Sequence, residues 1–199
     1  MRVHWLTPRV ALSGCVRYRE DMAALAEMGV THLLAFFSDD DRCWETNPKV
    51  ELAWAAEFGV EVYRINRADD AVPWPQELMR GALEYARTAL ATPGTRLLVH
   101  CMAGLCRSPV MAYGVLRHVF AMEREEARRL IEPLLAPDRT TLHEVYQASM
   151  EAHLLDGAEG RPAGASGPEG EEDVRGQGCA TPSSIEVTIS SPESRAGRS

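Results

Sequence analysis

The stretch from residue 96 to residue 120 constrains the fold more than any other part of the chain. Residues 96–100 end in a short apolar run, as expected of a buried strand, and residues 109–120 predict an apolar helix. The loop between them contains Gly104, which allows a sharp backbone turn. A strand, a tight loop and a helix form an anion-binding layout, because the helix N-terminus presents unpaired N–H groups and partial positive charge.

The side chains of this loop suggest covalent chemistry on a bound phosphate. The thiolate is the nucleophilic form of cysteine, and a helix N-terminus and a guanidinium both stabilise it, so Cys101 is the expected nucleophile. The planar guanidinium of Arg107 can hold two phosphate oxygens. Ser108 can donate a hydrogen bond to the sulfur of Cys101, both before attack and when that sulfur is the leaving group of the second step. The backbone N–H groups expected to converge on the anion belong to Met102, Ala103, Gly104, Leu105, Cys106 and Arg107.

A phosphate ester held in this loop needs a proton donor for its leaving oxygen. Asp69 and Asp70, in the acidic, proline-containing loop 66–75, are the expected suppliers, because a carboxyl group beside another carboxylate retains a proton more readily. The same group can then act as the base for a hydrolytic water. We expect His100 to orient Cys101 by hydrogen bonds to the loop backbone. No cofactor and no metal are expected, since no cluster of metal-ligating residues is visible in the sequence.

The remainder of the first 156 residues alternates strands with helices, which predicts an α/β fold with a mostly parallel sheet covered on both faces. In such a sheet ligands bind at the carboxyl ends of the strands, where Cys101 would lie. The expected strands are 10–14, 30–37, 60–65 and 96–100, and the expected helices are 19–28, 48–58, 75–90, 109–120, 123–135 and 141–155. Residues 157–199 are rich in Gly, Ser, Pro, Ala and Glu and predict a disordered tail, although 185–189 alternate like a strand.

Composition excludes several kinds of partner. The net charge of −8 argues against non-specific binding to nucleic acid or to an anionic membrane surface. The five cysteines are irregularly spaced and predict neither a disulfide framework nor a zinc site, which fits a reducing compartment. There is no apolar run of membrane-spanning length and no secretory signal pattern, so we expect a cytoplasmic protein. The oligomeric state is not predicted.

The run His100-Cys101-x5-Arg107-Ser108 resembles the signature of the cysteine-dependent protein tyrosine phosphatases, and its form is most similar to the small dual-specificity phosphatases. The similarity extends upstream to residues 12–14 and 29–34. Asp70 and Asp69 precede Cys101 by 31 and 32 residues, a spacing that fits the general acid of this family. The run 69–73 also resembles the acid loop of the phosphatases of regenerating liver, in which the second aspartate serves, and this favours Asp70.

The resemblance implies a catalytic domain over residues 1–156 with a four- or five-stranded sheet. It also implies hydrolysis of phosphotyrosine in proteins or peptides, extended to phosphoserine and phosphothreonine by a shallower pocket. Lipid and RNA substrates are disfavoured by the uncharged side chains of Met102, Ala103, Leu105 and Cys106. A catalytically weak, phospho-binding pseudophosphatase is the competing interpretation, and intact Cys101 and Arg107 count against it.

Three further features of the sequence each allow two interpretations. Cys106, where the family often has serine, is either a small filler or a partner for a protective disulfide with Cys101. Cys43 is either an ordinary core or surface cysteine or a distant resolving cysteine. The run 39–41, three aspartates, is either a solvated turn or a group of charges near the mouth of the site that repels acidic substrates.

Overall fold

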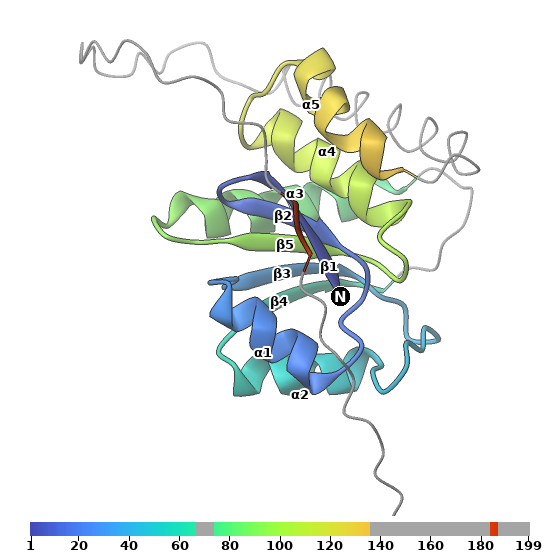
Figure 1. The fold of residues 1–199 in the computed structure, drawn as a ribbon. Coiled ribbons are helices and arrows are strands. Elements are labelled where there is room, and N and C mark those ends of the chain that lie inside the picture. The colour runs from blue at the N-terminus through green and yellow to red at the C-terminus, as the bar shows by residue number, and fades with distance from the viewer. Residues whose placement is uncertain (67–73, 136–183, 187–199) are drawn as a thin grey trace, which may run out of the picture.

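In the part of the chain that the computed structural model describes, residues 1–66, 74–135 and 184–186, six strands form one sheet. Their order is β4-β3-β5-β2-β1-β6 (Figure 1). The strands are β1 (Arg2–Thr7), β2 (Val10–Ser13), β3 (His32–Phe36), β4 (Glu61–Ile65), β5 (Leu97–His100) and β6 (Ser184–Glu186). The helices are α1 (Arg19–Glu27), α2 (Pro48–Glu57), α3 (Gln76–Ala91), α4 (Arg107–His118) and α5 (Arg124–Ile131), followed by the 3-10 helix η1 (Glu132–Leu134).

The four neighbouring strands β4, β3, β5 and β2 are parallel, which confirms the predicted fold class. β5 pairs with β2 on one side and with β3 on the other, and β4 extends the sheet beyond β3. β1 runs antiparallel to β2, and β6 runs antiparallel to β1. The register sets Ser13 of β2, Ala35 of β3 and His100 of β5 level with one another. The residues that follow these three positions therefore emerge together at the carboxyl edge of the sheet.

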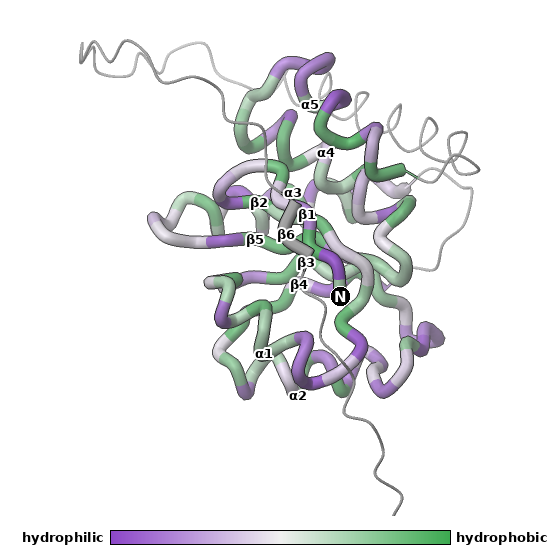
Figure 2. Tube along the Cα trace, viewed as in Figure 1, coloured by the Kyte–Doolittle hydropathy of each residue, from purple (hydrophilic) through white to green (hydrophobic). Residues whose placement is uncertain are grey.

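Helices cover both faces of the sheet, as predicted. α1 and α2 lie against one face, α3 and α4 lie against the other, and α5 packs on the outer side of α4 (Figure 1). Each face has its own apolar core, and α4 is buried along most of its length, with Tyr113 fully enclosed. Figure 2 shows the hydrophobic stretches along the central strands between these helical layers. No helix in the described residues is long and apolar enough to span a membrane.

Three details differ from the sequence-based expectations. β1 was not predicted, because its residues mix polar and apolar types without a clean alternation. The expected helix 123–135 ends its α-helical part at Ile131, since Pro133 lacks the N–H that an α-helix needs at that position. The expected helix 141–155 lies outside the described residues. Of the expected tail 157–199, only residues 184–186 are described, and they form β6 rather than irregular chain.

Arg9 lies at the amino edge of the sheet, opposite to the cysteine-containing loop, and its side chain hydrogen-bonds to backbone carbonyls there. Its Nε donates to the carbonyl of Thr95 at 3.1 Å, and its Nη2 donates to the carbonyls of Leu90 and Thr92, each at 2.7 Å. One side chain thereby satisfies carbonyl groups at the end of α3 and in the turn that leads to β5. Such C-terminal carbonyls have no partner within their own helix.

A disulfide bond joins Cys15, which follows β2, to Cys43, in the segment between β3 and α2. The expectation that Cys43 is an ordinary cysteine is therefore wrong, and a role as a direct resolving partner of Cys101 is not supported, because its sulfur is bonded to Cys15. The spacing of the five cysteines gave no sign of this pair, since the two residues come together only when β2 and β3 lie on either side of β5.

Reduction of this disulfide is expected to lower the melting temperature. The crosslink spans 28 residues, and closing a loop of that size in the unfolded chain stabilises the folded state by roughly 3 to 4 kcal/mol. Thermal unfolding followed by circular dichroism, with and without a phosphine reductant, measures the effect. A Cys15→Ser/Cys43→Ser variant is the control and should melt at one temperature in both conditions. A wild-type melting temperature that does not respond after complete reduction would contradict the prediction.

Candidate active site

The central loop, residues 101–107, connects β5 to the N-terminus of α4. β5 lies between β2 and β3 and is fully buried, so the loop begins at the middle of the carboxyl edge of the sheet. The first turn of α4, which includes Arg107 and Ser108, is also buried. The sequence-based expectation of strand, tight loop and helix is thus met by the backbone.

Close contact with the end of β2 determines the path of the central loop. Gly104 adopts φ +76°, the left-handed region that favours glycine. A Cβ added at Gly104 would lie 2.7 Å from the Gly14 nitrogen and 2.8 Å from the Ser13 carbonyl carbon. The Cys15 N–H donates to the Met102 carbonyl at 3.0 Å. The loop therefore rests directly on backbone at residues 13–15, with no room for a side chain between them.

Two donors point at the sulfur of Cys101. The Gly104 N–H and the Ser108 hydroxyl each lie 3.3 Å from Cys101 Sγ. The Ser108 hydroxyl also lies 3.4 Å from the Ser13 carbonyl oxygen, and its single hydrogen can go to only one of these acceptors at a time. Cys101 is only 2% exposed. The arrangement is suited to a sulfur that carries negative charge.

Arg107 lies at the other end of the loop and contacts a carboxylate of the run 39–41, for which the sequence left two interpretations. Its Nη1 is 3.3 Å from Asp41 Oδ2, and that oxygen also accepts from the Ser38 N–H at 2.8 Å. Of the two interpretations of the run 39–41, proximity to the loop holds for Asp41, while Asp40 is exposed. The sequence indicated the edge of the sheet, because the run follows a predicted parallel strand, but it did not show that this strand, β3, lies next to β5.

His100 has a different neighbour from the one expected. Its Nε2 lies 3.2 Å from Oε1 of Glu51, in α2, and both side chains are fully buried. Its ring also meets the ring of Phe37 edge-on at 6.4 Å between centroids. A role in orienting Cys101 would therefore act through a fixed ring beside a carboxylate. Nothing in the sequence distinguishes Glu51 from the surface acids of an ordinary helix.

The structure brings together the predicted loop residues, but two predicted positions lie outside the described residues. These are Asp69 and Asp70. The residues flanking their segment are held beside β3: Asn66 Nδ2 donates to Asp39 Oδ2 at 2.6 Å, and Trp74 is stacked on Phe36 with 4.8 Å between ring centroids. Cys106 is a buried thiol, 4% exposed, that packs in the core on the α4 side of the sheet. No grouping suited to holding a metal ion occurs within the described ranges.

Comparison with solved structures places this arrangement in a known fold. The crystal structure of Tk-PTP in the active form matches with a TM-score of 0.58 and 18% identity, covering 80% of this chain and 97% of that one. PTPMT1 in complex with PI(5)P matches with a TM-score of 0.59 and 19% identity, over 78% and 98% of the two chains. The chain has the fold of the protein tyrosine phosphatases.

A third match to the phosphatase fold is the human tyrosine phosphatase-like serine/threonine/tyrosine-interacting protein, with a TM-score of 0.56, 18% identity, and coverage of 77% and 97%. No protein-family model and no curated protein matches the sequence. At identities this low the likeness concerns the fold. The roles of individual residues must come from the chemistry of the site.

A Gly104→Ala substitution is expected to lower the affinity of the central loop for inorganic phosphate at least tenfold, because the new Cβ would push the loop away from residues 13–15. Isothermal titration calorimetry measures the affinity. Gly94→Ala is the matched control: Gly94 has φ +83° with no atom within 4 Å of an added Cβ, so it carries only the backbone penalty of about 1–2 kcal/mol. The Gly94→Ala variant should have a lower melting temperature than the wild type but the same affinity for phosphate. Equal affinities for the two variants would refute the packing argument.

An Asp41→Asn substitution is expected to tighten phosphate binding roughly three- to tenfold, since a carboxylate beside Arg107 offsets the positive charge and repels an anion. The same calorimetric titration measures this change. Asp40→Asn removes an equal charge from an exposed neighbouring position and should alter the affinity little. Weaker binding by Asp41→Asn would show instead that the carboxylate is needed to position the guanidinium.

Proposed function

We propose that the protein is a cysteine-dependent phosphatase that hydrolyses phosphotyrosine, and also phosphoserine or phosphothreonine, in phosphorylated proteins. The observation that carries the proposal is the pair of hydrogen-bond donors, the Gly104 N–H and the Ser108 hydroxyl, aimed at Cys101 Sγ at the N-terminus of α4. Donors of this kind stabilise a thiolate, which is the attacking form of cysteine. The phosphatase fold supports the same assignment.

The first chemical step is attack by the Cys101 thiolate on phosphorus. The sulfur–phosphorus bond forms as the bond from phosphorus to the substrate oxygen breaks, and that oxygen leaves with a proton from the general acid. The loop N–H groups of residues 102–107 and the Arg107 guanidinium bind the phosphoryl oxygens, where negative charge is concentrated. Asp41 Oδ2 lies 3.3 Å from Arg107 Nη1, so the phosphoryl oxygens compete with this carboxylate for the guanidinium.

The second step returns the enzyme to its starting state. Water attacks phosphorus of the phosphocysteine and gives its proton to the carboxylate left by the first step. The sulfur–phosphorus bond breaks, inorganic phosphate forms, and Cys101 leaves as a thiolate. The Ser108 hydroxyl, 3.3 Å from Sγ, is placed to donate a hydrogen bond to this leaving group.

We assign the general acid to Asp70, with Asp69 as the alternative. Chain order supports a general acid near residue 70, because β4 ends at Ile65, four residues before Asp69, on the carboxyl edge of the sheet where Cys101 also lies. The flanking contacts support it too, since Asn66 and Trp74 are both held next to β3, the strand beside β5.

A protein substrate is favoured over the other phosphoesters. The side chains of the central loop before Arg107 are uncharged, and the net charge of −8 opposes binding to nucleic acid or to an anionic bilayer. A lipid or RNA phosphatase, and a catalytically weak phospho-binding pseudophosphatase, are the alternative functions. The turnover experiment below separates a phosphatase from a pseudophosphatase, and substrate panels separate the remaining classes.

The cytoplasmic location remains a prediction from sequence. The Cys15–Cys43 disulfide weighs against a strongly reducing compartment, where such bonds are rare. Neither Cys15 nor Cys43 takes part in the proposed chemistry, which requires Cys101 as a free thiol.

The decisive measurement is steady-state hydrolysis of an aryl phosphate. The wild type should turn over, and Cys101→Ser should show no turnover while still binding phosphate. Asp70→Asn should lose about 10²-fold or more in kcat, since a general acid contributes typically 10²–10⁴-fold. Asp69→Asn is the matched control and should retain activity.

Each alternative outcome has a definite meaning. Activity in Cys101→Ser would exclude the mechanism. Loss in Asp69→Asn with activity in Asp70→Asn would move the acid by one residue. Phosphate binding by a wild type that never turns over would identify a pseudophosphatase.

A further inference from the structure

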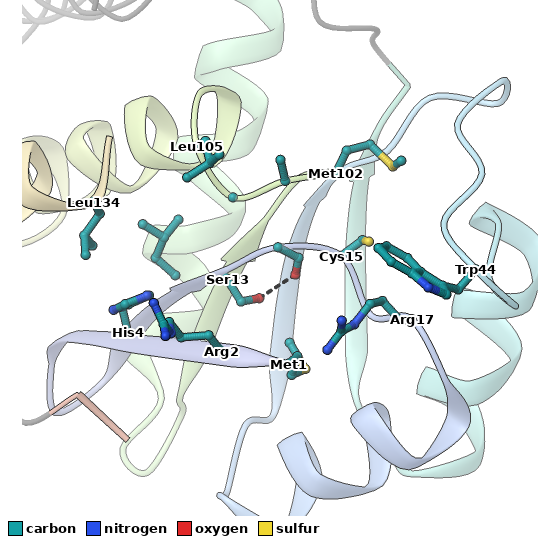
Figure 3. A pocket seen from close by; sticks show the side chains of 14 residues that line it. Met1, Arg2, His4, Ser13, Cys15, Arg17, Trp44, Met102, Leu105 and Leu134 are labelled. Carbon is teal, nitrogen blue, oxygen red and sulfur yellow. Dashed lines mark hydrogen bonds between the residues drawn. The ribbon is translucent and has the colours of Figure 1, made fainter. Parts of the chain in front are cut away.

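A pocket of about 570 Å³ opens beside the central loop, on the side of β1 (Figure 3). Residues 102–105 of the central loop and residues 12–15 at the end of β2 line it, together with the start of β1. Cys101 and Arg107 do not belong to its described lining. The pocket therefore adjoins the central loop without containing the two residues that carry the proposed chemistry. We name it the β1 pocket.

The β1 pocket offers apolar contacts rather than free charge. Among the described residues, four large hydrophobic side chains are exposed, and two of them, Trp44 (70%) and Leu105 (42%), line this pocket. Each of its two arginines already has a partner: Arg17 Nε lies 3.7 Å from Asp21 Oδ2, and Arg2 also interacts with another group. Exposed apolar surface beside a pocket is typical of a site that binds protein chain. An uncharged, partly apolar segment is therefore the complementary occupant.

The direction of β6 brings the C-terminal region to this pocket. β6 runs antiparallel to β1, with Glu186 opposite Arg2. β1 in turn runs antiparallel to β2, with Val3 opposite Ser13, and Ser13 is level with His100 at the end of β5. β6 therefore runs in the same direction as β2 and β5. Its last residue, Glu186, reaches the carboxyl edge of the sheet, where the central loop begins.

The segment that follows β6 has the length and the sequence to enter the pocket. β6 lies two strand spacings from β2, about 10 Å, and an extended chain covers about 3.3 Å per residue. Residues 187–190 are therefore long enough to span from the end of β6 to the end of β2. Their sequence, Val-Thr-Ile-Ser, is uncharged and alternates apolar with polar residues. The large aliphatic residues of the region 157–199 are concentrated here, since only Val174 lies outside 185–189.

We propose that the β1 pocket binds the segment of this chain that follows β6, residues 187–190, with the side chains of Val187 and Ile189 against its apolar lining. Pairing of β6 with β1 tethers the segment beside the pocket, and the resulting effective concentration allows weak contacts to suffice. A phosphopeptide whose phosphate lies in the central loop needs the surface around Leu105, so the docked segment competes with it. The competition, unlike the docking, rests on the proposed phosphatase function.

Photo-crosslinking in the full chain tests the docking. A benzophenone amino acid in place of Trp44 should crosslink to residues 187–190, and mass spectrometry of the digested protein locates the link. The matched control carries the same amino acid in place of Phe120, an exposed aromatic residue (37%) beyond the C-terminus of α4. α4 has 12 residues and is about 18 Å long, so Phe120 lies far from the central loop and should give no such link.

Two crosslinking results would overturn the docking. One is the absence of any link between position 44 and residues 187–190. The other is a link that always joins two chains, which would assign the pocket to the C-terminal region of a second copy. Size-exclusion chromatography under denaturing conditions separates linked pairs of chains from chains that are linked internally.

Steady-state kinetics test the competition. Val187→Asp should raise kcat/KM for a phosphotyrosine peptide about three- to tenfold, through a lower KM, because a charged side chain is costly to bury against apolar groups. Val174→Asp is the matched control: it makes the same substitution in the same region of the sequence, before β6, and should leave kcat/KM unchanged. Hydrolysis of a small aryl phosphate should change little, because such a substrate does not extend over the pocket. An unchanged kcat/KM for the peptide in Val187→Asp would overturn the competition.

The two experiments separate the docking from the proposed function. A link from position 44 to residues 187–190 in a protein that hydrolyses no aryl phosphate would overturn the phosphatase assignment and leave the docking in place. Aryl phosphate hydrolysis by a protein that forms no such link would overturn the docking and leave the phosphatase assignment in place.

Discussion

The close approach between the central loop and the end of β2 is the contact on which the rest of the site depends. Gly104 lies against the backbone of residues 13–14, and the Met102 carbonyl accepts a hydrogen bond from Cys15. Because two stretches of backbone touch directly, the loop has little freedom to open, and the Gly104 N–H stays aimed at Cys101 Sγ. The position of Cys101 Sγ between the Gly104 N–H and the Ser108 hydroxyl follows from this packing rather than from contacts with a ligand.

Two side chains of the loop region have carboxylate neighbours from other elements. Arg107 faces Asp41, and His100 faces Glu51. The two pairs differ in accessibility: Glu51 is fully buried, whereas the Asp41 side chain is 19% exposed. A dianionic phosphate can displace an accessible carboxylate from Arg107, while the buried pair keeps its place. We therefore expect Asp41 to influence phosphate affinity and Glu51 to hold His100 in place.

The sequence predicts the central loop of this site well, but it predicts poorly the residues from other elements that contact the loop. The key loop residues lie close together in the sequence: Cys101, Gly104, Arg107 and Ser108. The order of strand, loop and helix is also a local property, which hydrophobic periodicity and the position of glycine indicate. Asp41, Glu51 and the Cys15–Cys43 bond depend on which strands lie next to β5, and that information is spread over the whole chain. β1 was not predicted for a similar reason. Its residues show only a weak alternation of polar and apolar types, and pairing with β2 stabilises the strand.

The closure of the amino edge of the sheet by Arg9 has a consequence for how such a protein can change over evolutionary time. A single guanidinium donates hydrogen bonds to three backbone carbonyls there. These acceptors belong to the backbone, so they are present whichever side chains the residues carry. The opposite edge carries the loops that meet the substrate. Substitutions in those loops leave the contacts of Arg9 intact, because these contacts are made to backbone at the other edge of the sheet.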